Sequence, residues 1–353
     1  MTCSRTYDPA PETPALAFVD TLAPRPYALG RESLAGLGGT EQMVARIAGA
    51  LARDASVEVR QARRDVPTCE GGVLFRPFDP ASPAGTFVVV TSWKVAVMLR
   101  QHHPAARILL WLHVFPGRHN RRMGAALHAA GIEVICVSAS HAAWFADWLP
   151  GPPPRIGHIH NAIDDGLRPD GTALDRDQLL FASAPHKGLR EVYAAFAHLR
   201  ARIPSLTLAV ADPGYLAWNA GRPPEGVVQL GRLGQDDLHR RMRRSLCLFY
   251  PQTAFAETFG LVIAEANALG CPALLHRGLG ANDEVVSDPA QLVDATDPDG
   301  IATRIAAWRD RRPEVAVRPE FRHSAIVETW RRLLAPASAD TAPTEAIGAE
   351  PAG

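Results

Sequence analysis

Short apolar runs that alternate with helical patterns constrain the fold of this chain more than any other feature. Five runs in the first half are nearly continuous and rich in Val, Ile and Leu, at residues 15–20, 57–62, 86–92, 106–113 and 133–138. Such runs are typical of parallel strands that are covered on both faces. Helical patterns follow several of them, at residues 40–54, 93–103 and 141–149. Thr40 is the expected N-cap of the first helix.

The second half repeats this alternation and therefore predicts a second sheet. Its strand-like runs lie at residues 178–184, 206–212, 227–232, 247–251 and 272–277, and its helical patterns at 187–202, 235–245 and 259–269. A stretch rich in Pro, Gly and Asp at residues 151–171 separates the two halves. The predicted fold class is α/β, with two Rossmann-like, doubly wound parallel-sheet domains facing a cleft, where open sheets bind ligands.

The domain boundaries are expected to follow this division. We predict an N-terminal Rossmann-like domain over residues 15–163 and a C-terminal Rossmann-like domain over residues 164–320. A final helix is expected within 321–335, although the sequence does not show where it docks. The two ends, 1–14 and 336–353, are rich in Pro, Thr and charge or in Ala and Pro, and are predicted to be disordered.

The charge balance argues against a broad nucleic-acid-binding surface, because 37 basic and 37 acidic residues cancel. No two cysteines form a C-x-x-C pair, and Cys136 and Cys247 lie in apolar runs that predict reduced core thiols, which favours the cytoplasm. No secretory signal pattern opens the chain, and no run reaches the roughly 20 apolar residues of a membrane span. A peripheral contact with the inner face of a membrane stays open.

The segment FAETFGLVIAEANALGCPALL, residues 255–275, carries the strongest chemical signal. Glu257 is predicted in a loop and Glu265 about two turns into the following helix. Backbone N–H groups at 259–261 would point out of the helix N-terminus, which favours an anion such as a diphosphate. Gly260 would let a phosphate approach the backbone. Two carboxylates at this spacing suit two sets of sugar hydroxyls, although a bare pair is also typical of a solvated surface helix.

This segment resembles the E-x7-E signature of retaining GT-B glycosyltransferases of the family 4 (group 1) type. Six further segments are similar to that family in order and spacing, at residues 37–51, 111–117, 137–145, 158–167, 183–189 and 231–251. The resemblance implies transfer of a sugar from a nucleotide-diphosphate sugar to an acceptor hydroxyl with retention of configuration. It also implies that residues 15–163 form the acceptor-side domain and residues 164–320 the nucleotide-sugar-binding domain. It implies no metal or cofactor beyond the donor itself, and a glycan, lipid-linked or small-molecule acceptor, as in cell-envelope polysaccharide or lipopolysaccharide synthesis.

The resemblance also implies three catalytic roles. Lys187 would neutralise the donor diphosphate, which agrees with a lysine and glycine that follow a strand and open a helix. Glu257 would bind hydroxyls of the donor sugar, and His113 would lie beside the transferred sugar and stabilise charge near its anomeric carbon. An ordinary surface lysine and a structural histidine are the alternatives. We expect the turn at 257–261 to face Lys187 across the interdomain groove.

The remaining donor contacts come from the same resemblance. Gly38 and Gly39 would turn the backbone below the phosphates, unless they only start a helix. Glu265 would accept hydrogen bonds from the ribose. The full donor-binding set also includes Lys187, Glu257 and the backbone of Arg232, Leu233, Thr258, Phe259, Gly260 and Leu261.

Three positions depart from the family pattern. Ala182 stands where an arginine usually pairs with the lysine, so one positive charge of the diphosphate clamp is missing. His186 and Arg190 are the neighbouring residues that would compensate. Val114 follows the cleft histidine where many relatives have aspartate, and His160 stands where a proline usually precedes the asparagine.

Several weaker signals were weighed and set aside. Asp297-Pro298-Asp299 has D-x-D spacing, but a polar loop without a phosphate-binding context gives no reason for a metal. The pairs His158/His160 and His102/His103 have no sequence partner at metal-ligand spacing. Ser138, Ser140 and His141 lack the G-x-S-x-G elbow of a hydrolase. GLGG at 36–39 lacks the full dinucleotide-binding motif.

Three other functions remain open on these residues. A same-fold epimerase or hydrolase would act on the nucleotide sugar itself. A non-catalytic member would bind the nucleotide sugar without turnover, and the missing arginine favours this alternative. A Rossmann dehydrogenase is the third. The nucleotide base, the sugar and the acceptor cannot be read from the sequence.

Overall fold

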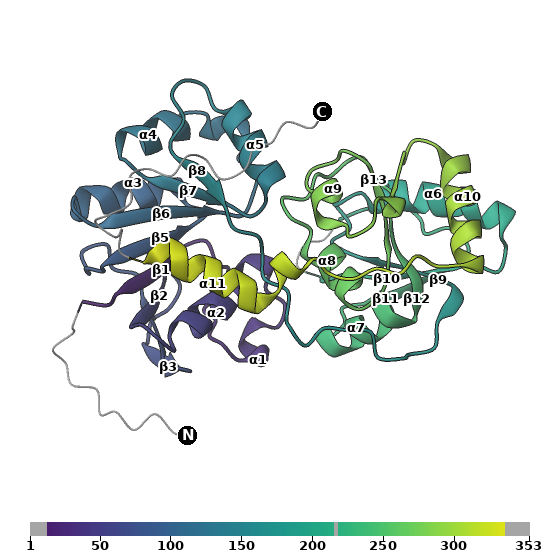
Figure 1. Cartoon of the computed structure of the whole chain (residues 1–353), viewed down its shortest axis with the longest axis horizontal. Helices are drawn as coiled ribbons and strands as arrows, with labels where there is room; N and C mark the ends of the chain where they lie inside the picture. The colour runs from purple at the N-terminus through teal and green to yellow at the C-terminus, as the bar shows by residue number, and fades with distance from the viewer. Residues whose placement is uncertain (1–12, 215–217, 336–353) are drawn as a thin grey trace.

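Two sheets organise the chain in this computed structural model, which describes residues 13–214 and 218–335 (Figure 1). The first sheet has the strand order β3-β4-β2-β1-β5-β6-β7-β8, and the second has β11-β10-β9-β12-β13-β14. Neighbouring strands are parallel, except that β3 runs antiparallel to β4. Each sheet reverses its order about a central strand, so both are doubly wound and the predicted fold class is confirmed.

The first sheet and its helices lie on one side of the molecule. Its strands are β1 Leu16–Asp20, β2 Val57–Gln61, β3 Thr68–Glu70, β4 Val73–Pro77, β5 Thr86–Val90, β6 Arg107–Leu112, β7 Glu133–Cys136 and β8 Ile156–His158. The helices are α1 Arg31–Leu34, α2 Gly39–Leu51, α3 Trp93–His102, α4 Met123–Ala129 and α5 Ala139–Trp148. Strands β1, β2 and β5–β7 are almost fully buried, as their continuous apolar runs predicted.

The second sheet forms the other side. Its strands are β9 Asp175–Ala182, β10 Thr207–Ala211, β11 Val227–Gly231, β12 Ser245–Tyr250, β13 Ala273–His276 and β14 Leu292–Val293. Its helices are α6 Leu189–Arg202, α7 Gln235–Arg244, α8 Leu261–Ala268, α9 Asn282–Val285 and α10 Pro298–Asp310. Every predicted strand and helix overlaps an observed one. The strands β3, β4, β8 and β14 and the helices α1, α4, α9 and α10 were not predicted.

The last helix, α11 His323–Leu334, returns to the first sheet, as the yellow ribbon in Figure 1 shows. Trp330 is fully buried there, with its ring centroid 4.9 Å from that of Trp111 and 6.4 Å from that of Phe18. The Arg107 guanidinium donates to the Leu333 carbonyl at 2.6 Å. The C-terminal segment therefore completes the core of the N-terminal domain.

The chain crosses between the domains twice, and the two crossings are joined. Ile163 N–H donates to the Phe321 carbonyl at 2.8 Å, and His323 N–H donates to the Ile163 carbonyl at 2.8 Å. This short parallel bridge ties the first crossing to the second at one point. Beyond this point the two domains are separated by a cleft.

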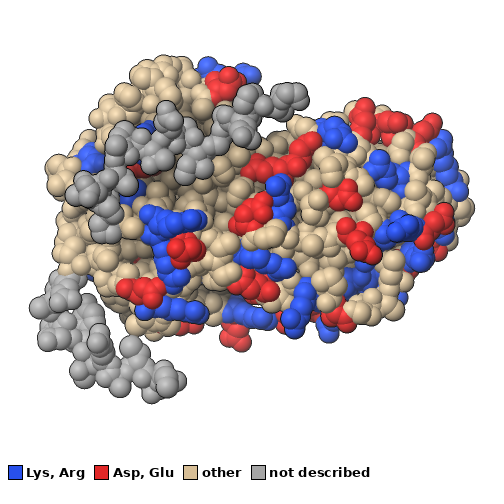
Figure 2. Space-filling model, in the orientation of Figure 1, with Lys and Arg blue, Asp and Glu red and all other residues tan. Residues whose placement is uncertain are grey.

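Two further expectations concern surface and termini. Figure 2 shows basic and acidic side chains interspersed over one face, in keeping with their balance in the sequence. Among the described residues, no helix combines the length and the apolar character that crossing a membrane would need. The predicted disorder of the two ends, 1–14 and 336–353, falls outside the described residues, apart from residues 13 and 14.

Candidate active site

A cleft of about 2450 Å³ lies between the two domains. Every residue that the sequence analysis predicted for the site lines it: Gly38, Gly39, His113, Lys187, Arg232, Leu233, Glu257, Thr258, Phe259, Gly260, Leu261 and Glu265. The carboxyl ends of β6, β9 and β12 open into this cleft through the residues that follow them. The cleft therefore occupies the place where two facing doubly wound sheets bind ligands.

Lys187 and Glu257 form the charged centre of the cleft. The Lys187 ammonium lies 3.0 Å from both carboxylate oxygens of Glu257 and 4.6 Å from the ring centroid of Phe255. The Tyr250 hydroxyl lies 3.3 Å from Oε1 of Glu257, which is only 8% exposed. The expectation that the two face each other across the groove is wrong, because both extend from the second sheet and share one wall.

Glycine fixes the turn that carries Glu257 into helix α8. Gly260 adopts φ 89°, and a Cβ there would lie 2.7 Å from Cδ1 of Ile263. The N–H groups of Ile263 and Ala264 both donate to the Gly260 carbonyl, so the helix begins at Leu261. The N–H groups of the preceding turn residues have no earlier helical turn to bond to, which leaves an anion-binding helix end facing the cleft.

A second glycine, which the sequence analysis did not identify, holds the Glu257 loop from behind. Gly280 has φ 57°, and a Cβ there would lie 2.5 Å from the Glu257 carbonyl oxygen. The neighbouring Ala281 N–H donates to that same carbonyl at 3.0 Å. The loop after β13 thus sets the position of the Glu257 backbone. The pattern that could have identified Gly280 is GLGAND at 278–283, where two closely spaced glycines precede a helix.

Glu265 lies deeper in α8 and is 9% exposed. Burial raises its pKa to about 7, while the nearby charge of Arg46 and a long hydrogen bond from Gln235 act in the opposite direction. Gln235 Nε2 lies 3.5 Å from Oε1 of Glu265 and 2.9 Å from Nε2 of His239. Arg46, on α2 of the other domain, and Gln235 line the cleft but were not predicted as site residues, although both lie in segments that resemble the family, 37–51 and 231–251.

The starts of two helices meet across the cleft. Gly38 is the N-cap of α2, so the prediction that Thr40 would cap this helix is wrong, and no side chain caps it. A Cβ on Gly39 would lie 2.5 Å from Cδ1 of Leu261, the first residue of α8. Only glycine allows this approach without displacing the leucine. Two positive helix ends, one from each domain, therefore point toward the same region.

His113 follows β6 on the N-terminal wall and is 7% exposed. Its Nε2 has no hydrogen-bond partner among the described residues. Burial, with a smaller contribution from His141, lowers the pKa of His113 to about 3. The imidazole is therefore neutral near pH 7. A neutral imidazole can exchange a hydrogen bond with a ligand.

Ser138 and His141 do not form a nucleophile–base pair. Ser138 caps α5 by accepting from the backbone N–H of His141 at 2.9 Å, and its hydroxyl donates to the Thr258 carbonyl at 2.6 Å. Nδ1 of His141 faces the Val137 N–H instead. Burial lowers the pKa of His141 to about 4. Ser138 therefore links the two domains, and neither residue is arranged to activate a nucleophile.

The substituted arginine position, Ala182, lines the cleft at the end of β9, but His186 and Arg190 do not line it. The His186 ring lies near Phe255 and Trp218, and burial together with Lys187 lowers its pKa. The guanidinium of Arg232, by contrast, lines the cleft and lies against Gly36 of the other domain. Arg232 is thus a cleft cation whose side chain, and not only its backbone, reaches the interdomain region.

The structure gives a different interpretation of two weaker sequence signals, Asp297 and the pair His158/His160. Asp297 does not lie in a plain loop, because it is the N-cap of α10 and accepts from the N–H groups of Asp299 and Gly300. The interpretation that His158 and His160 lack a metal-ligating partner is wrong. Glu284 joins them from the other domain, and one potential ligand atom from each residue lies within 4.8 Å of the others.

Comparisons with known proteins agree with this architecture. Residues 175–322 match the family model "Glycosyl transferases group 1". No curated protein sequence matches the chain. A sucrose-phosphate synthase from Thermosynechococcus elongatus is similar in structure, with a TM-score of 0.66 and 16% identity over 90% of this chain and 97% of that one.

Two Burkholderia structures are also similar. The trehalose 6-phosphate synthase from Burkholderia multivorans has a TM-score of 0.63 and 14% identity over 92% of this chain and 96% of that one. The UDP-forming trehalose-phosphate synthase from Burkholderia xenovorans, in complex with glucose-6-phosphate, has the same TM-score and identity over 90% and 99%. These structures show the shared fold, and the family match confirms the resemblance. Residues 175–322 therefore form a region similar to group 1 glycosyltransferases, in a chain whose two-domain fold is shared with these structures.

Proposed function

We propose that this glycosyltransferase moves a sugar from a nucleotide-diphosphate sugar to an acceptor hydroxyl, with retention of configuration and without a metal. The observation that carries the proposal is the Lys187 ammonium, 3.0 Å from both oxygens of Glu257, beside the start of α8. The cleft around this pair has about 2450 Å³. That volume exceeds the roughly 300–1,000 Å³ of a usual small-molecule site and leaves room for both substrates.

Lys187 and the first N–H groups of α8 would stabilise the departing diphosphate. Preorganised donors that meet developing charge are usually the largest catalytic contribution. Without donor, the charge of Lys187 is balanced by Glu257. A bound diphosphate would compete for the ammonium, and the Glu257 carboxylate would then accept hydrogen bonds from hydroxyls of the donor sugar. The neutral His113 would contact the same sugar from the opposite wall.

The nucleoside would extend along α8 toward Glu265. A carboxylate accepts hydrogen bonds from ribose hydroxyls, so donor binding would favour the ionised form of Glu265 although burial raises its pKa to about 7. The backbone of Arg232 and Leu233 would contact the base. The side chain of Arg232 and the start of α2 at Gly38–Gly39 would add positive potential near the phosphates, in place of the arginine that is absent at Ala182.

Two classes of acceptor fit different observations. The resemblance favours a cell-envelope glycan or a lipid-linked sugar, and a lipid-linked acceptor would bring this cytoplasmic chain to the inner face of a membrane. The alternative is a phosphorylated sugar, as in the neighbour bound to glucose-6-phosphate. Arg46 of α2 and Arg53, which follows that helix, line the N-terminal wall and favour this second class. Assays with glucose-6-phosphate and with lipid-linked acceptors separate the two.

The donor is best found by thermal shift against UDP-, GDP-, ADP- and dTDP-sugars, because a saturating ligand stabilises the fold by mass action. Turnover is then measured with and without acceptor. Nucleotide release at full rate without acceptor would identify a hydrolase or epimerase. Donor binding without turnover would identify a non-catalytic member, and a binding response to NADH alone would favour a dehydrogenase.

A further inference from the structure

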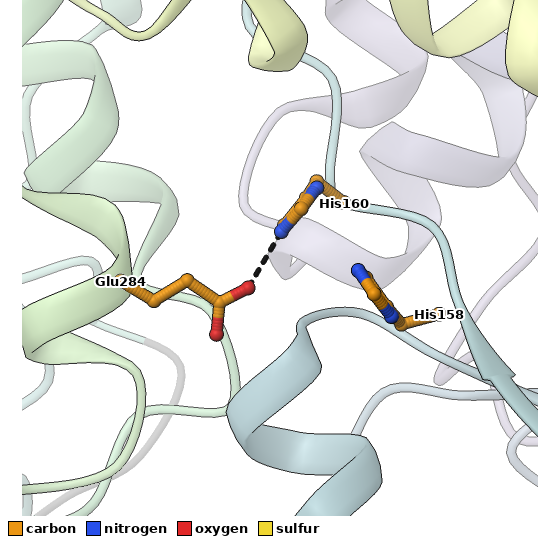
Figure 3. A group of neighbouring side chains, drawn as sticks. All are labelled: His158, His160 and Glu284. Atoms are coloured by element: carbon orange, nitrogen blue, oxygen red, sulfur yellow. Dashed lines mark hydrogen bonds and ion pairs between the residues drawn. The ribbon is translucent and has the colours of Figure 1, made fainter. Parts of the chain in front are cut away.

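Three residues from both domains point toward one another, and none of them lines the cleft (Figure 3). His158 ends β8, His160 follows in the first crossing, and Glu284 comes from α9 of the C-terminal domain. Nε2 of His160 lies 2.6 Å from Oε1 of Glu284, and the two imidazole centroids lie 5.0 Å apart. We call these residues the interdomain histidine–glutamate cluster.

The ligand types suit a transition metal of borderline softness. Two imidazoles and one carboxylate form a common Zn²⁺ set, with a fourth position left for water. One potential ligand atom from each residue lies within 4.8 Å of the others. Bonds of roughly 2.0–2.2 Å around a tetrahedral ion place ligand atoms roughly 3.3 Å apart. The His160 and Glu284 atoms would therefore separate by less than an ångström while His158 moves closer.

Glu284 is already oriented by groups that a metal would leave in place. One carboxylate oxygen accepts from the Ala139 N–H at 2.8 Å, and the other accepts from the Ser140 N–H at 2.8 Å and its hydroxyl at 2.7 Å. Such outer contacts fix the direction of a ligating carboxylate. They come from the start of α5 in the N-terminal domain, so Glu284 already spans the interface.

The charges around the cluster leave room for a cation. Arg318 donates to the Glu284 carbonyl at 2.9 Å and pairs with Glu320 at 2.8 Å. Among the described residues that line the hollow around the cluster, Glu284 and Glu320 therefore outnumber the single guanidinium, that of Arg318. All three cluster residues line this hollow of about 370 Å³ that opens to the surface and gives an ion an entry path.

We propose that His158, His160 and Glu284 bind a Zn²⁺ ion that joins the two domains outside the active-site cleft. This inference is independent of the sugar donor and the transfer reaction. The ion would take the place of the proton between His160 and Glu284 and recruit His158. It would thereby convert a hydrogen-bonded contact between domains into a coordinated one.

His158→Ala separates this proposal from a purely hydrogen-bonded role of the cluster. The substitution removes one ligand, but it leaves the His160–Glu284 contact and the capping of α5 intact. Without metal, its melting temperature should equal that of the wild type, because His158 is exposed and contacts only the ring of His160 within the cluster. The matched control is His102→Ala, which also removes a histidine beside another imidazole, with centroids 6.3 Å apart.

The experiment titrates ZnCl₂ into chelator-treated, untagged full-length protein by calorimetry. Co²⁺ is added in parallel to record the visible absorption of a tetrahedral site. We expect one equivalent of Zn²⁺ to bind the wild type and the His102→Ala variant. His158→Ala should weaken binding at least about tenfold, as loss of a metal-site interaction does, and should abolish the Co²⁺ band. No stoichiometric binding, or equal affinity in His158→Ala, would overturn the proposal.

Discussion

Thr258 of the C-terminal domain donates its hydroxyl hydrogen to the backbone carbonyl of His113 in the N-terminal domain, over 2.9 Å. Its own carbonyl accepts from Ser138 of that same domain at 2.6 Å. Thr258 directly follows Glu257, and His113 ends the strand on the opposite wall. The hydrogen bond therefore links the positions of two residues that the proposed reaction requires on either side of one sugar.

Removing this link should reduce turnover more than it reduces stability. Thr258→Val keeps the shape of the side chain but leaves the His113 carbonyl without its donor, which should cost about 1–2 kcal/mol of the free energy of unfolding. We expect kcat to fall about tenfold, with a smaller change in donor KM, measured by steady-state kinetics. Thr329→Val is the control, because the Thr329 hydroxyl bonds only within α11. Equal kcat in both variants would argue against the link.

The Lys187–Glu257 pair gives the next prediction. Lys187→Ala removes the proposed counter-charge for the leaving diphosphate, so kcat should fall by about 10²–10³. Lys94→Ala is the matched control, since Lys94 lies on α3 outside the cleft. Melting temperatures measured by calorimetry should show that both variants remain folded. Wild-type turnover in Lys187→Ala would contradict the proposed catalytic role of Lys187.

Donor affinity should depend on pH through Glu265. Burial raises the pKa of this carboxyl from 4.5 to about 7, so in the free protein it carries a proton below about pH 7. Ribose hydroxyls favour the ionised form, and donor Kd should therefore fall as pH rises from 5.5 to 8, by up to about tenfold per unit below the pKa. Calorimetric titrations across this range test the slope. Glu265→Gln should bind more weakly and show a flatter profile.

The same shift predicts a stability change of opposite sign. The folded protein prefers the neutral carboxyl, so the contribution of Glu265 to stability is present below pH 4.5 and is lost as pH rises toward 7. Comparing wild type with Glu265→Gln in denaturant at pH 5 and pH 8 isolates this contribution. The variant should gain stability relative to the wild type at the higher pH. A constant difference would contradict the raised pKa.

Gly280 offers a test of how the Glu257 loop is held. An alanine there would place its Cβ 2.5 Å from the Glu257 carbonyl, in addition to the strain of φ 57°. Gly280→Ala should lower turnover at least about tenfold and destabilise the fold by more than about 2 kcal/mol. Gly278→Ala is the control, because it has φ 74° but no atom within 4 Å of the added Cβ. If both substitutions had similar effects, the strain of a positive φ alone would explain them, and the proposed contact between Gly280 and the Glu257 carbonyl would be contradicted.

Much of the fold could be predicted because its strands are buried on both faces. Runs such as 86–92 and 247–251 are apolar on both faces, and both form buried strands in the structure. Three of the missed strands, β3, β8 and β14, have three residues or fewer and lie at sheet edges. Strand β3 is fully exposed, and β14 has only two residues, so neither has a continuous apolar pattern.

Site residues could be predicted from the sequence only where they lie close together in one short segment. Glu257, Gly260 and Glu265 lie within nine residues and share a recognisable spacing, and all three line the cleft. Glu284 lies more than 120 residues beyond His160, so no local pattern could join them. The lowered pKa of His113 was equally hidden, because it depends on burial that only the packed structure provides.

Transfer itself, followed by proton NMR with the donor found by thermal shift, tests the central claim most directly. With acceptor and excess EDTA, we predict one nucleoside diphosphate per glycoside formed, and a product whose anomeric coupling matches that of the donor. Without acceptor, nucleotide release should be slow, because the cleft is built to hold both substrates. An inverted product, full-rate release without acceptor, or turnover abolished by EDTA and restored by a divalent metal would contradict this account.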